Sequence, residues 1–194
     1  MPEVSAEIQT DARGGAGVTG RLALLVVLGG VLFWGLMGVS MMLYPGGHSG
    51  DLQAPGHSFL YNYWCDLLGA RSRSGQANPV GAPLASAGFV CFSVVFAAFV
   101  LLACRVLAQP SNLFRCGAVL GGLGALGALL VGTTPDRWWP AGHAGLVSVS
   151  GGLGVLATTL MMPGLWCRPR SGLRALVRLE RALGALALAA GILR

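Results

Sequence analysis

The chain has 194 residues, of which 54% are hydrophobic and only 10% are charged, and its net charge is +6. Soluble chains average about 25% charged residues, so this composition excludes an ordinary soluble domain. The positive charge comes from Arg at the ends of apolar runs, not from a basic patch with interleaved aromatic residues, which excludes a nucleic-acid partner. We therefore expect an all-α, polytopic membrane protein.

The chain divides into a short polar tail and one transmembrane domain. Residues 1–20 are polar and Gly-rich, with too few apolar residues for a core, and are expected to form a disordered cytoplasmic tail. Residues 21–194 form the transmembrane helical domain. Four spans are predicted from nearly uncharged runs long enough to cross a hydrocarbon layer of about 30 Å: 22–43, 82–104, 113–133 and 141–162.

The last apolar segment, residues 173–193, is less regular than the others. Its first half carries Arg174, Arg178 and Arg181 on one helical face, and the uncharged part after them is too short to span by itself. The segment is either a fifth span, with its charges at the inner head groups, or an interfacial helix.

The first long connection, residues 44–81, concentrates polar and aromatic residues. On a helical wheel, residues 58–69 form an amphipathic helix with a polar stripe of Ser58, Asn62 and Asp66. The opposite side of the wheel is apolar and consists of Phe59, Leu60, Tyr63, Trp64, Leu67 and Leu68. We expect this helix to lie at the membrane interface or to be tucked over the bundle.

The orientation follows from the Arg residues near the ends of the spans. With the N-terminus in the cytoplasm, nine Arg lie inside and four lie outside, as the positive-inside rule requires. We therefore expect an integral membrane protein whose N-terminus is cytoplasmic. The connection 44–81 and the connection before the fourth span then share the outer face.

Four residues of this outer face are weak catalytic candidates: His57, Asp66, Asp136 and His143. Two His and two carboxylates could bind zinc or activate water, but their spacing matches no metal signature, so no cofactor is predicted and a metal ion is only an alternative. A carboxylate beside an apolar layer is costly without a partner. Asp66 is therefore expected to pair with an Arg or to bind a ligand.

A larger set is predicted to bind a ligand, because its members lie on the polar stripe, beside it, or at the outer end of a seam of small residues in the fourth span. These residues are Ser58, Asn62, Trp64, Asp66 and His143. The candidate partners of Asp66 are Arg71, Arg73 and Arg137.

Small residues crowd the third and fourth spans, including Gly117, Gly121 and Gly124 in the third. Such residues allow helix backbones to approach closely in lipid. We expect the third and fourth spans to form a tight hairpin. Association with a second copy or with another membrane protein is the alternative use of the same residues.

Three motifs in order, "YPGG", "GHSFLYNYWCDLLG" followed by "GQANPVG", and "VGTTPDRWWPAGHAG", resemble an uncharacterised bacterial multi-pass family, domain of unknown function 998. That family is distantly similar to the FRAG, DRAM and Sfk type of membrane protein. The resemblance covers about residues 22–163 and implies a six-helix bundle with its polar motif in the first outer loop. On this chain the motif falls on His57, Asn62, Asp66, Asn78, Pro135 and His143.

The resemblance implies no activity, so the function is argued from the residues. We expect non-enzymatic binding of a membrane lipid or amphiphile at the outer leaflet, or a role as a membrane subunit for a partner. A membrane-embedded hydrolase acting on lipid head groups through the His and Asp residues is one alternative. A small transporter is another, although no internal repeat supports it.

Overall fold

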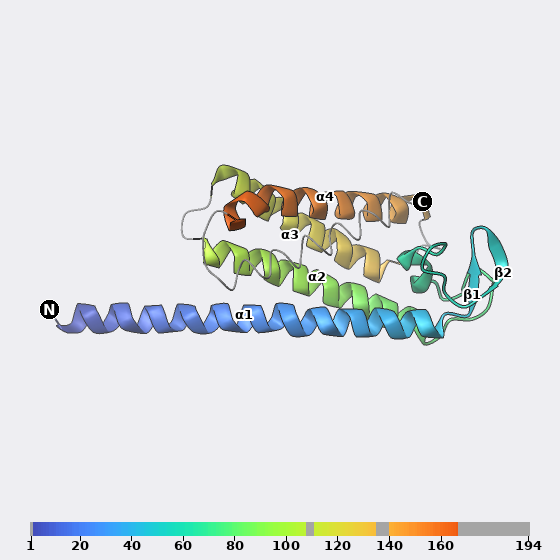
Figure 1. The fold of residues 1–194 in the computed structure, drawn as a ribbon, viewed down its shortest axis with the longest axis horizontal. Helices are drawn as coiled ribbons and strands as arrows, with labels where there is room; N and C mark the ends of the chain where they lie inside the picture. Colours follow the sequence, from blue (N-terminus) through green and yellow to red (C-terminus); the bar gives the residue numbers. More distant parts are fainter. Residues whose placement is uncertain (1, 108–110, 135–139, 167–194) are drawn as a thin grey trace.

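The computed structural model describes residues 2–107, 111–134 and 140–166, and it is an all-α polytopic bundle (Figure 1). Its four long helices are α1 (Pro2–Leu43), α2 (Gly81–Val106), α3 (Asn112–Thr133) and α4 (Pro140–Trp166). Two short strands, β1 (Gly46–His48) and β2 (Asp51–Pro55), and a 3₁₀ helix, η1 (Trp64–Leu68), lie between α1 and α2.

The four expected spans are confirmed as helices long and apolar enough to cross a membrane: Gly17–Leu43, Gly81–Val106, Asn112–Thr133 and Ala141–Leu165. These helices make the chain an integral membrane protein. The fifth predicted helix, 173–193, lies outside the described residues. The helix α1 begins at Pro2, within the tail that is predicted to be disordered. Once a helix is nucleated, each added residue gains a backbone hydrogen bond, which favours such an extension.

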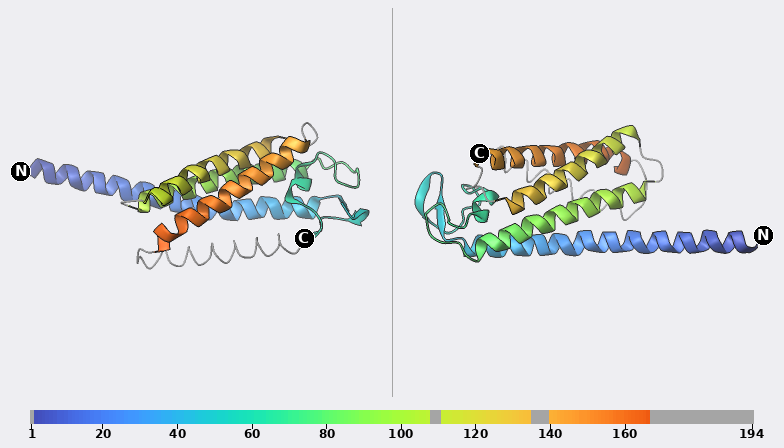
Figure 2. Two further views of the ribbon diagram at one scale, coloured as in Figure 1. Left: turned by 90° about the horizontal axis from the view of Figure 1, so that it is seen from above. Right: turned by 180° about the vertical axis from the view of Figure 1, so that it is seen from behind.

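The helices form a row in which each one packs mainly on its neighbour in sequence (Figure 2). α2 and α3 occupy the middle of this row, where 28% and 39% of their most apolar windows are buried. The corresponding share is only 11% for α1 and for α4. The two outer helices of the row therefore present most of their apolar surface to lipid.

The predicted hairpin of the third and fourth spans is confirmed. A methyl group added at Gly117 would lie 2.9 Å from the carbonyl oxygen of Ala157, and one added at Gly124 would lie 3.2 Å from the backbone nitrogen of Gly154. The α3 and α4 backbones are thus as close as glycine permits, which is how helices gain packing energy in lipid.

Residues 44–80 fold into a small domain on the ends of the helices, the cap. β1 and β2 form an antiparallel hairpin, and Gly47, with a φ of +84°, brings β1 against the backbone of Ser74. Ser74 also donates a backbone hydrogen bond of 3.1 Å to the carbonyl oxygen of Gly46. The cap is therefore closed on itself by backbone contacts between its two ends.

The prediction of an amphipathic helix over 58–69 is wrong. Residues 58–63 form a turn with Tyr63 in an extended conformation, and only Trp64–Leu68 is helical, as a 3₁₀ helix. The physical reason is local competition: the side chains of Asn62 and Asp66 accept hydrogen bonds from the backbone nitrogens of Ser58 and Tyr63. Such side-chain bonds offer the backbone an alternative to the α-helix.

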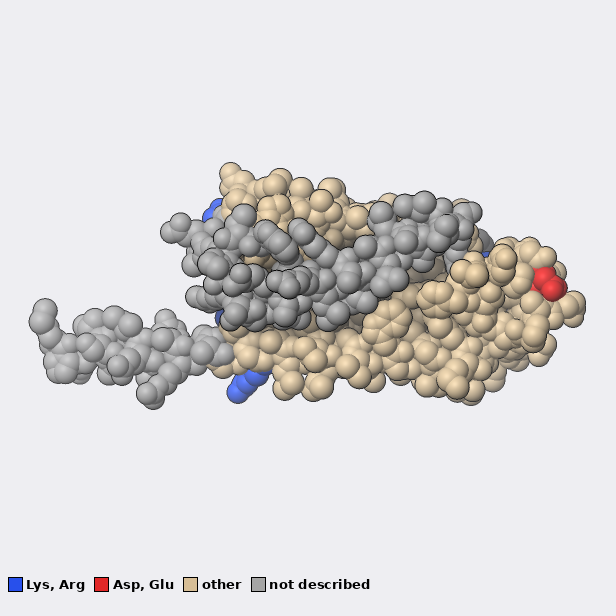
Figure 3. All heavy atoms as spheres, in the orientation of Figure 1, with Lys and Arg blue, Asp and Glu red and all other residues tan. Residues whose placement is uncertain are grey.

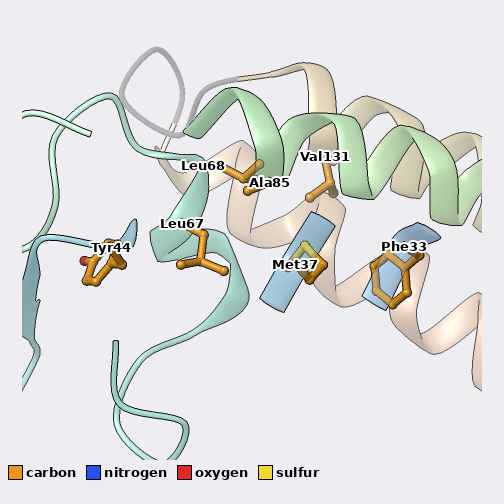
Figure 4. Close-up of a cluster of buried hydrophobic side chains, with 7 residues drawn as sticks. All are labelled: Phe33, Met37, Tyr44, Leu67, Leu68, Ala85 and Val131. Atoms are coloured by element: carbon orange, nitrogen blue, oxygen red, sulfur yellow. The ribbon is translucent and has the colours of Figure 1, made fainter. Parts of the chain in front are cut away.

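The break in the helix separates the apolar residues of the segment into two groups. Leu67 and Leu68 are buried against the helices, in a cluster with Phe33, Met37, Tyr44, Ala85 and Val131 (Figure 4). The turn residues Phe59, Leu60 and Tyr63 are exposed instead. One apolar face predicted from the sequence is therefore two surfaces in the structure, of which one seats the cap and the other is open.

Candidate functional site

Asp66 is the centre of the polar network inside the cap. Its side chain is buried, and its Oδ1 lies 2.7 Å from Nη2 and 2.9 Å from Nε of Arg73. Its Oδ2 accepts hydrogen bonds from the side-chain amide of Asn62 at 3.1 Å and from the backbone nitrogen of Tyr63 at 3.0 Å. Both carboxylate oxygens thus have donors, and the expected pairing of Asp66 with an Arg is confirmed for Arg73.

Asn62 links this carboxylate to the β-hairpin. It is fully buried, and its Nδ2 also donates to the carbonyl oxygen of Gly47 at 2.8 Å. Its Oδ1 accepts from the backbone nitrogen of Ser58 at 2.9 Å. The predicted stripe of Ser58, Asn62 and Asp66 is therefore brought together by a turn instead of a helical face, with Ser58 bonded through its backbone nitrogen.

Tyr44 closes the same network from the end of α1. Its hydroxyl accepts from the backbone nitrogen of Arg73 at 2.9 Å and donates to the carbonyl oxygen of Gly47 at 3.5 Å. Burial raises the pKa of the Tyr44 phenol above its ordinary value, while the hydrogen bond from Arg73 acts in the opposite direction. Tyr44 was not among the site residues predicted from the sequence, although its position before Pro45 at the end of a span was a usable signal.

Asn78 fastens the other end of the cap. It is buried, and its Nδ2 donates to the carbonyl oxygens of Leu67 at 3.1 Å and Gly69 at 3.2 Å. These carbonyls terminate η1 and would otherwise need water. Asn78 was included only in the family motif, and an Asn followed by Pro at the start of a span is a signal that could have selected it.

The His residues occupy separate surroundings. The His57 ring lies 5.7 Å from the Tyr44 ring in an edge-to-face arrangement. His143 is buried at the start of α4, and its Nδ1 lies 3.1 Å from the carbonyl oxygen of Thr134, to which it donates if it carries the ring proton. Within the described part of the chain, its Nε2 has no hydrogen-bond partner. Asp136, the fourth catalytic candidate, lies outside the described residues.

Two of the catalytic candidates, Asp66 and His143, have separate contacts. Asp66 is bonded to Arg73 and Asn62, whereas His143 contacts a backbone carbonyl. Among residues 2–107, 111–134 and 140–166, no three His, Cys, Asp or Glu side chains are grouped so that they could hold a metal ion. The described contacts of Asp66 are therefore those of a structural residue.

Trp64 connects the cap to the membrane-spanning helices. Its ring lies 5.6 Å from that of Trp34 in an edge-to-face arrangement and 5.9 Å from that of Phe33. Aromatic pairs at such separations contribute about 0.5–1.5 kcal/mol beyond area burial. Trp64, predicted as a ligand-binding residue, is therefore in the contact between cap and bundle.

Charged residues are distributed unevenly between the two ends of the bundle. Arg21, Arg105 and Arg115 lie near the ends of the membrane-spanning segments that are away from the cap. Most of the basic atoms visible in Figure 3 are at that end, while the visible acidic atoms are at the cap. The cap itself contains two Arg and two Asp, so its formal charge is balanced.

Comparisons of this chain with protein-family models, with curated proteins and with solved structures found no match. The resemblance to the domain of unknown function 998 therefore stays a prediction that rests on its motifs.

Proposed function

We propose that this integral membrane protein binds a lipid or another amphiphile at the cap end of its bundle, without catalysing a reaction. One observation carries the proposal: the cap uses its buried polar groups to hold itself together, yet it exposes an apolar turn. Four residues of the turn are each more than half exposed: Phe59, Leu60, Tyr61 and Tyr63. Exposed aromatic and aliphatic groups of this kind mark sites of contact with lipid or protein.

The location of the turn favours lipid. Trp64 follows it directly and packs on Trp34, which lies nine residues before the end of α1, or about 14 Å along the helix axis. The turn is thus tied to a helix that crosses the membrane. Tyr and Trp are enriched where the hydrocarbon layer meets the head groups.

We propose in addition that the cap lies on the outer face. Three Arg, at positions 21, 105 and 115, lie near the ends of the spans opposite the cap, whereas Arg73 of the cap is neutralised by Asp66. An excess of Arg at one end supports a cytoplasmic location for that end. The N-terminus would then be cytoplasmic and the cap would meet the outer leaflet.

The contacts of Asp66 argue against the hydrolase alternative. A catalytic carboxylate must reach a substrate or a water molecule, and both oxygens of Asp66 already accept hydrogen bonds from Arg73, Asn62 and Tyr63. Releasing the carboxylate would break the contacts that close the cap. These contacts support binding through the apolar turn more than chemistry through the acid.

The proposal is tested by measuring which lipids remain with the protein after extraction in a mild detergent. We expect wild-type protein to retain a lipid in native mass spectrometry and the double variant Phe59→Ser, Leu60→Ser to retain less of it. Leu52→Ser is the matched control, because Leu52 is similarly exposed but belongs to β2 and not to the turn. Retention of a protein instead of lipid, or release of lipid head groups during incubation, would contradict the proposal.

A further inference from the structure

His48 is the last residue of strand β1, at the end of the molecule farthest from the N-terminus (Figure 1). Its Nδ1 accepts hydrogen bonds from two backbone nitrogens of the turn that leads into β2, at 3.2 Å from Gly50 and at 3.1 Å from Asp51. A methyl group added at Gly50 would lie 3.5 Å from the ring, so the imidazole lies on the turn backbone. The side chain of His48 therefore stabilises this turn, as Asn and Asp side chains do in many others.

A further contact joins this imidazole to the exposed apolar turn of the cap. The His48 and Tyr61 rings are stacked, with centroids 5.0 Å apart and an interplanar angle of 23°. Tyr61 is one of the turn residues that the proposed function assigns to the amphiphile. Two residues of β1 thus support this turn, because the neighbouring Gly47 accepts the side-chain hydrogen bond of Asn62.

The two hydrogen bonds define the protonation state of His48. A ring nitrogen accepts a hydrogen bond through its lone pair, so Nδ1 carries no proton and the neutral ring carries its proton on Nε2. Protonation would place a second N–H at Nδ1, directed at two backbone N–H groups. The ring would have to rotate away from these donors and would then leave the face of Tyr61. The attraction of a cationic ring for this face does not restore the stack, because the two donors exclude the present ring position.

The titratable groups of the hairpin and of the apolar turn do not offset this loss. Asp51, opposite His48 in the hairpin register, is exposed, and its Oδ1 accepts a hydrogen bond from the backbone nitrogen of Gln53 at 2.8 Å. An exposed carboxylate attracts a cation only weakly, because water screens it. The phenol of Tyr61 is the titratable group of the turn in contact with the imidazole, and Tyr keeps its proton at neutral and acid pH.

The segment 71–77 contacts β1 at Gly47 and carries the two Arg of the cap. Arg73 is paired with Asp66, and Arg71 donates to a backbone carbonyl of its own segment. Arg stays protonated in proteins, so neither residue changes its charge. Histidine is the side chain that ordinarily gains its charge between about pH 8 and pH 5. On these elements, the charge of His48 is therefore the one that changes in this range.

We infer that His48 is a positioning residue of the amphiphile site, and that it positions Tyr61 only while its ring is neutral. This inference rests on the proposed function and adds regulation by pH to it. Holding Tyr61 in one orientation lowers the cost of ordering the turn when a ligand binds. Acid should therefore weaken binding, and by linkage a bound amphiphile opposes protonation of His48.

The experiment measures binding of fluorescent phospholipids to the full-length protein in a mild detergent, at about pH 8 and at about pH 5. The probe is a mixture of phosphatidylcholine and phosphatidylglycerol, whose head groups both keep their charge over this range. We expect the affinity to be about tenfold lower in acid, the effect of losing one net hydrogen bond. Equal affinities would overturn the inference and leave the proposed function standing, whereas no binding at either pH would refute both.

Two substitutions of His48 separate its positioning role from a merely structural one. His48→Asn keeps an acceptor for the backbone nitrogens of Gly50 and Asp51 but takes up no proton, so its affinity should be independent of pH. His48→Ala removes both the acceptor and the ring, and its affinity should be as low at both pH values as that of the wild type in acid. A pH response that persists in His48→Asn would contradict the inference.

Three control variants test the other titratable groups. Asp51→Asn removes the carboxylate opposite His48, and His57→Gln and His143→Gln replace the other two His of the chain. Each should keep the pH response of the wild type, and its loss in any of them would assign the response to that residue and overturn the inference. Nitrogen-15 NMR of the histidines in the wild type makes the test independent of folding defects. At about pH 8 it should show the Nδ1 of His48 without a proton, and a proton there would also overturn the inference.

Discussion

The cap and the α3–α4 hairpin are both held closely together, but by contacts of different chemistry. In the cap, Asp66, Asn62 and Arg73 make short polar bonds between segments that have little regular secondary structure. In the hairpin, Gly117 and Gly124 bring two helix backbones together through van der Waals contact. The difference matches the surroundings of the two regions, which are water for the cap and lipid for the hairpin.

In water, an unpaired backbone group can always form a hydrogen bond with a water molecule. An irregular segment therefore needs specific polar bonds within the protein to adopt one conformation. In lipid, each helix has already satisfied its backbone, and hydrophobicity does not drive helix association. Close packing of small residues then becomes the main source of specificity. Substitutions should accordingly act through sterics in the hairpin and through charge and hydrogen bonding in the cap.

The largest effect is expected for Gly117→Leu in the hairpin. A β-carbon at this position would meet the backbone oxygen of Ala157, which can move only if α4 moves, and overpacking of this kind costs about 1–3 kcal/mol. Gly122→Leu on the same helix has nothing within 4 Å and should be neutral, or stabilising by up to about 1 kcal/mol through helix propensity. Thermal unfolding in detergent measures both variants, and equal destabilisation of the two would contradict the steric explanation.

A somewhat smaller effect is expected for Arg73→Ala in the cap. It leaves the Asp66 carboxylate buried without its cation, and we expect a loss of about 2 kcal/mol, below the usual cost of breaking a buried pair because Arg73 is half-exposed. Limited proteolysis between residues 69 and 78 should become faster. Arg71→Ala, which removes one exposed bond to Gly75, is the control and should change little.

The double variant Arg73→Ala, Asp66→Asn tests whether charge is the cause. Because Asn removes the unpaired charge but can still accept a hydrogen bond, the double variant should be more stable than Arg73→Ala alone. Additive losses would show that the two residues act independently, and the explanation by an ion pair would then be wrong.

The smallest effect concerns pH and Tyr44. Burial raises the pKa of this phenol in the folded cap. The stability that the neutral phenol contributes is therefore complete below the pKa of the unfolded chain, about 10. It is lost as the pH rises through the higher pKa of the folded cap. The variant Tyr61→Phe, Tyr63→Phe leaves Tyr44 as the chain's one tyrosine, whose ionisation can be followed by ultraviolet absorbance. We expect a midpoint above 10 together with faster proteolysis of the cap at alkaline pH, and a midpoint at or below 10 would contradict this account.

Much of the fold could be predicted because its signals are local and strong. Uncharged runs of about twenty residues must become helices in lipid, and the four described spans agree with the expected ranges to within a few residues, apart from the extended N-terminus of the first helix. The small residues of α3 and α4 likewise predicted their close contact. The Asp66 partner was among three Arg named from the sequence, since a buried carboxylate requires a cation or several donors.

The cap could not be derived in the same way. The pattern of residues 58–69 fits an α-helical wheel, but Asn62 and Asp66 bond to nearby backbone nitrogens and break the helix before Trp64. This outcome depends on Gly47, Tyr44 and Arg73, which arrive from both ends of the cap. Helical periodicity describes the residues of one segment alone, so it cannot predict a structure that depends on contacts with other segments.

The sequence by itself therefore determined that the chain spans a membrane and located the four described spans, because burial in lipid imposes its requirements on each segment separately. Only the tertiary structure decided that Asp66 is paired with Arg73, that His143 meets the backbone of Thr134, and that Trp64 joins the cap to the rings of α1. These contacts link residues from different segments, and their energies depend on distances that exist only after the chain has folded.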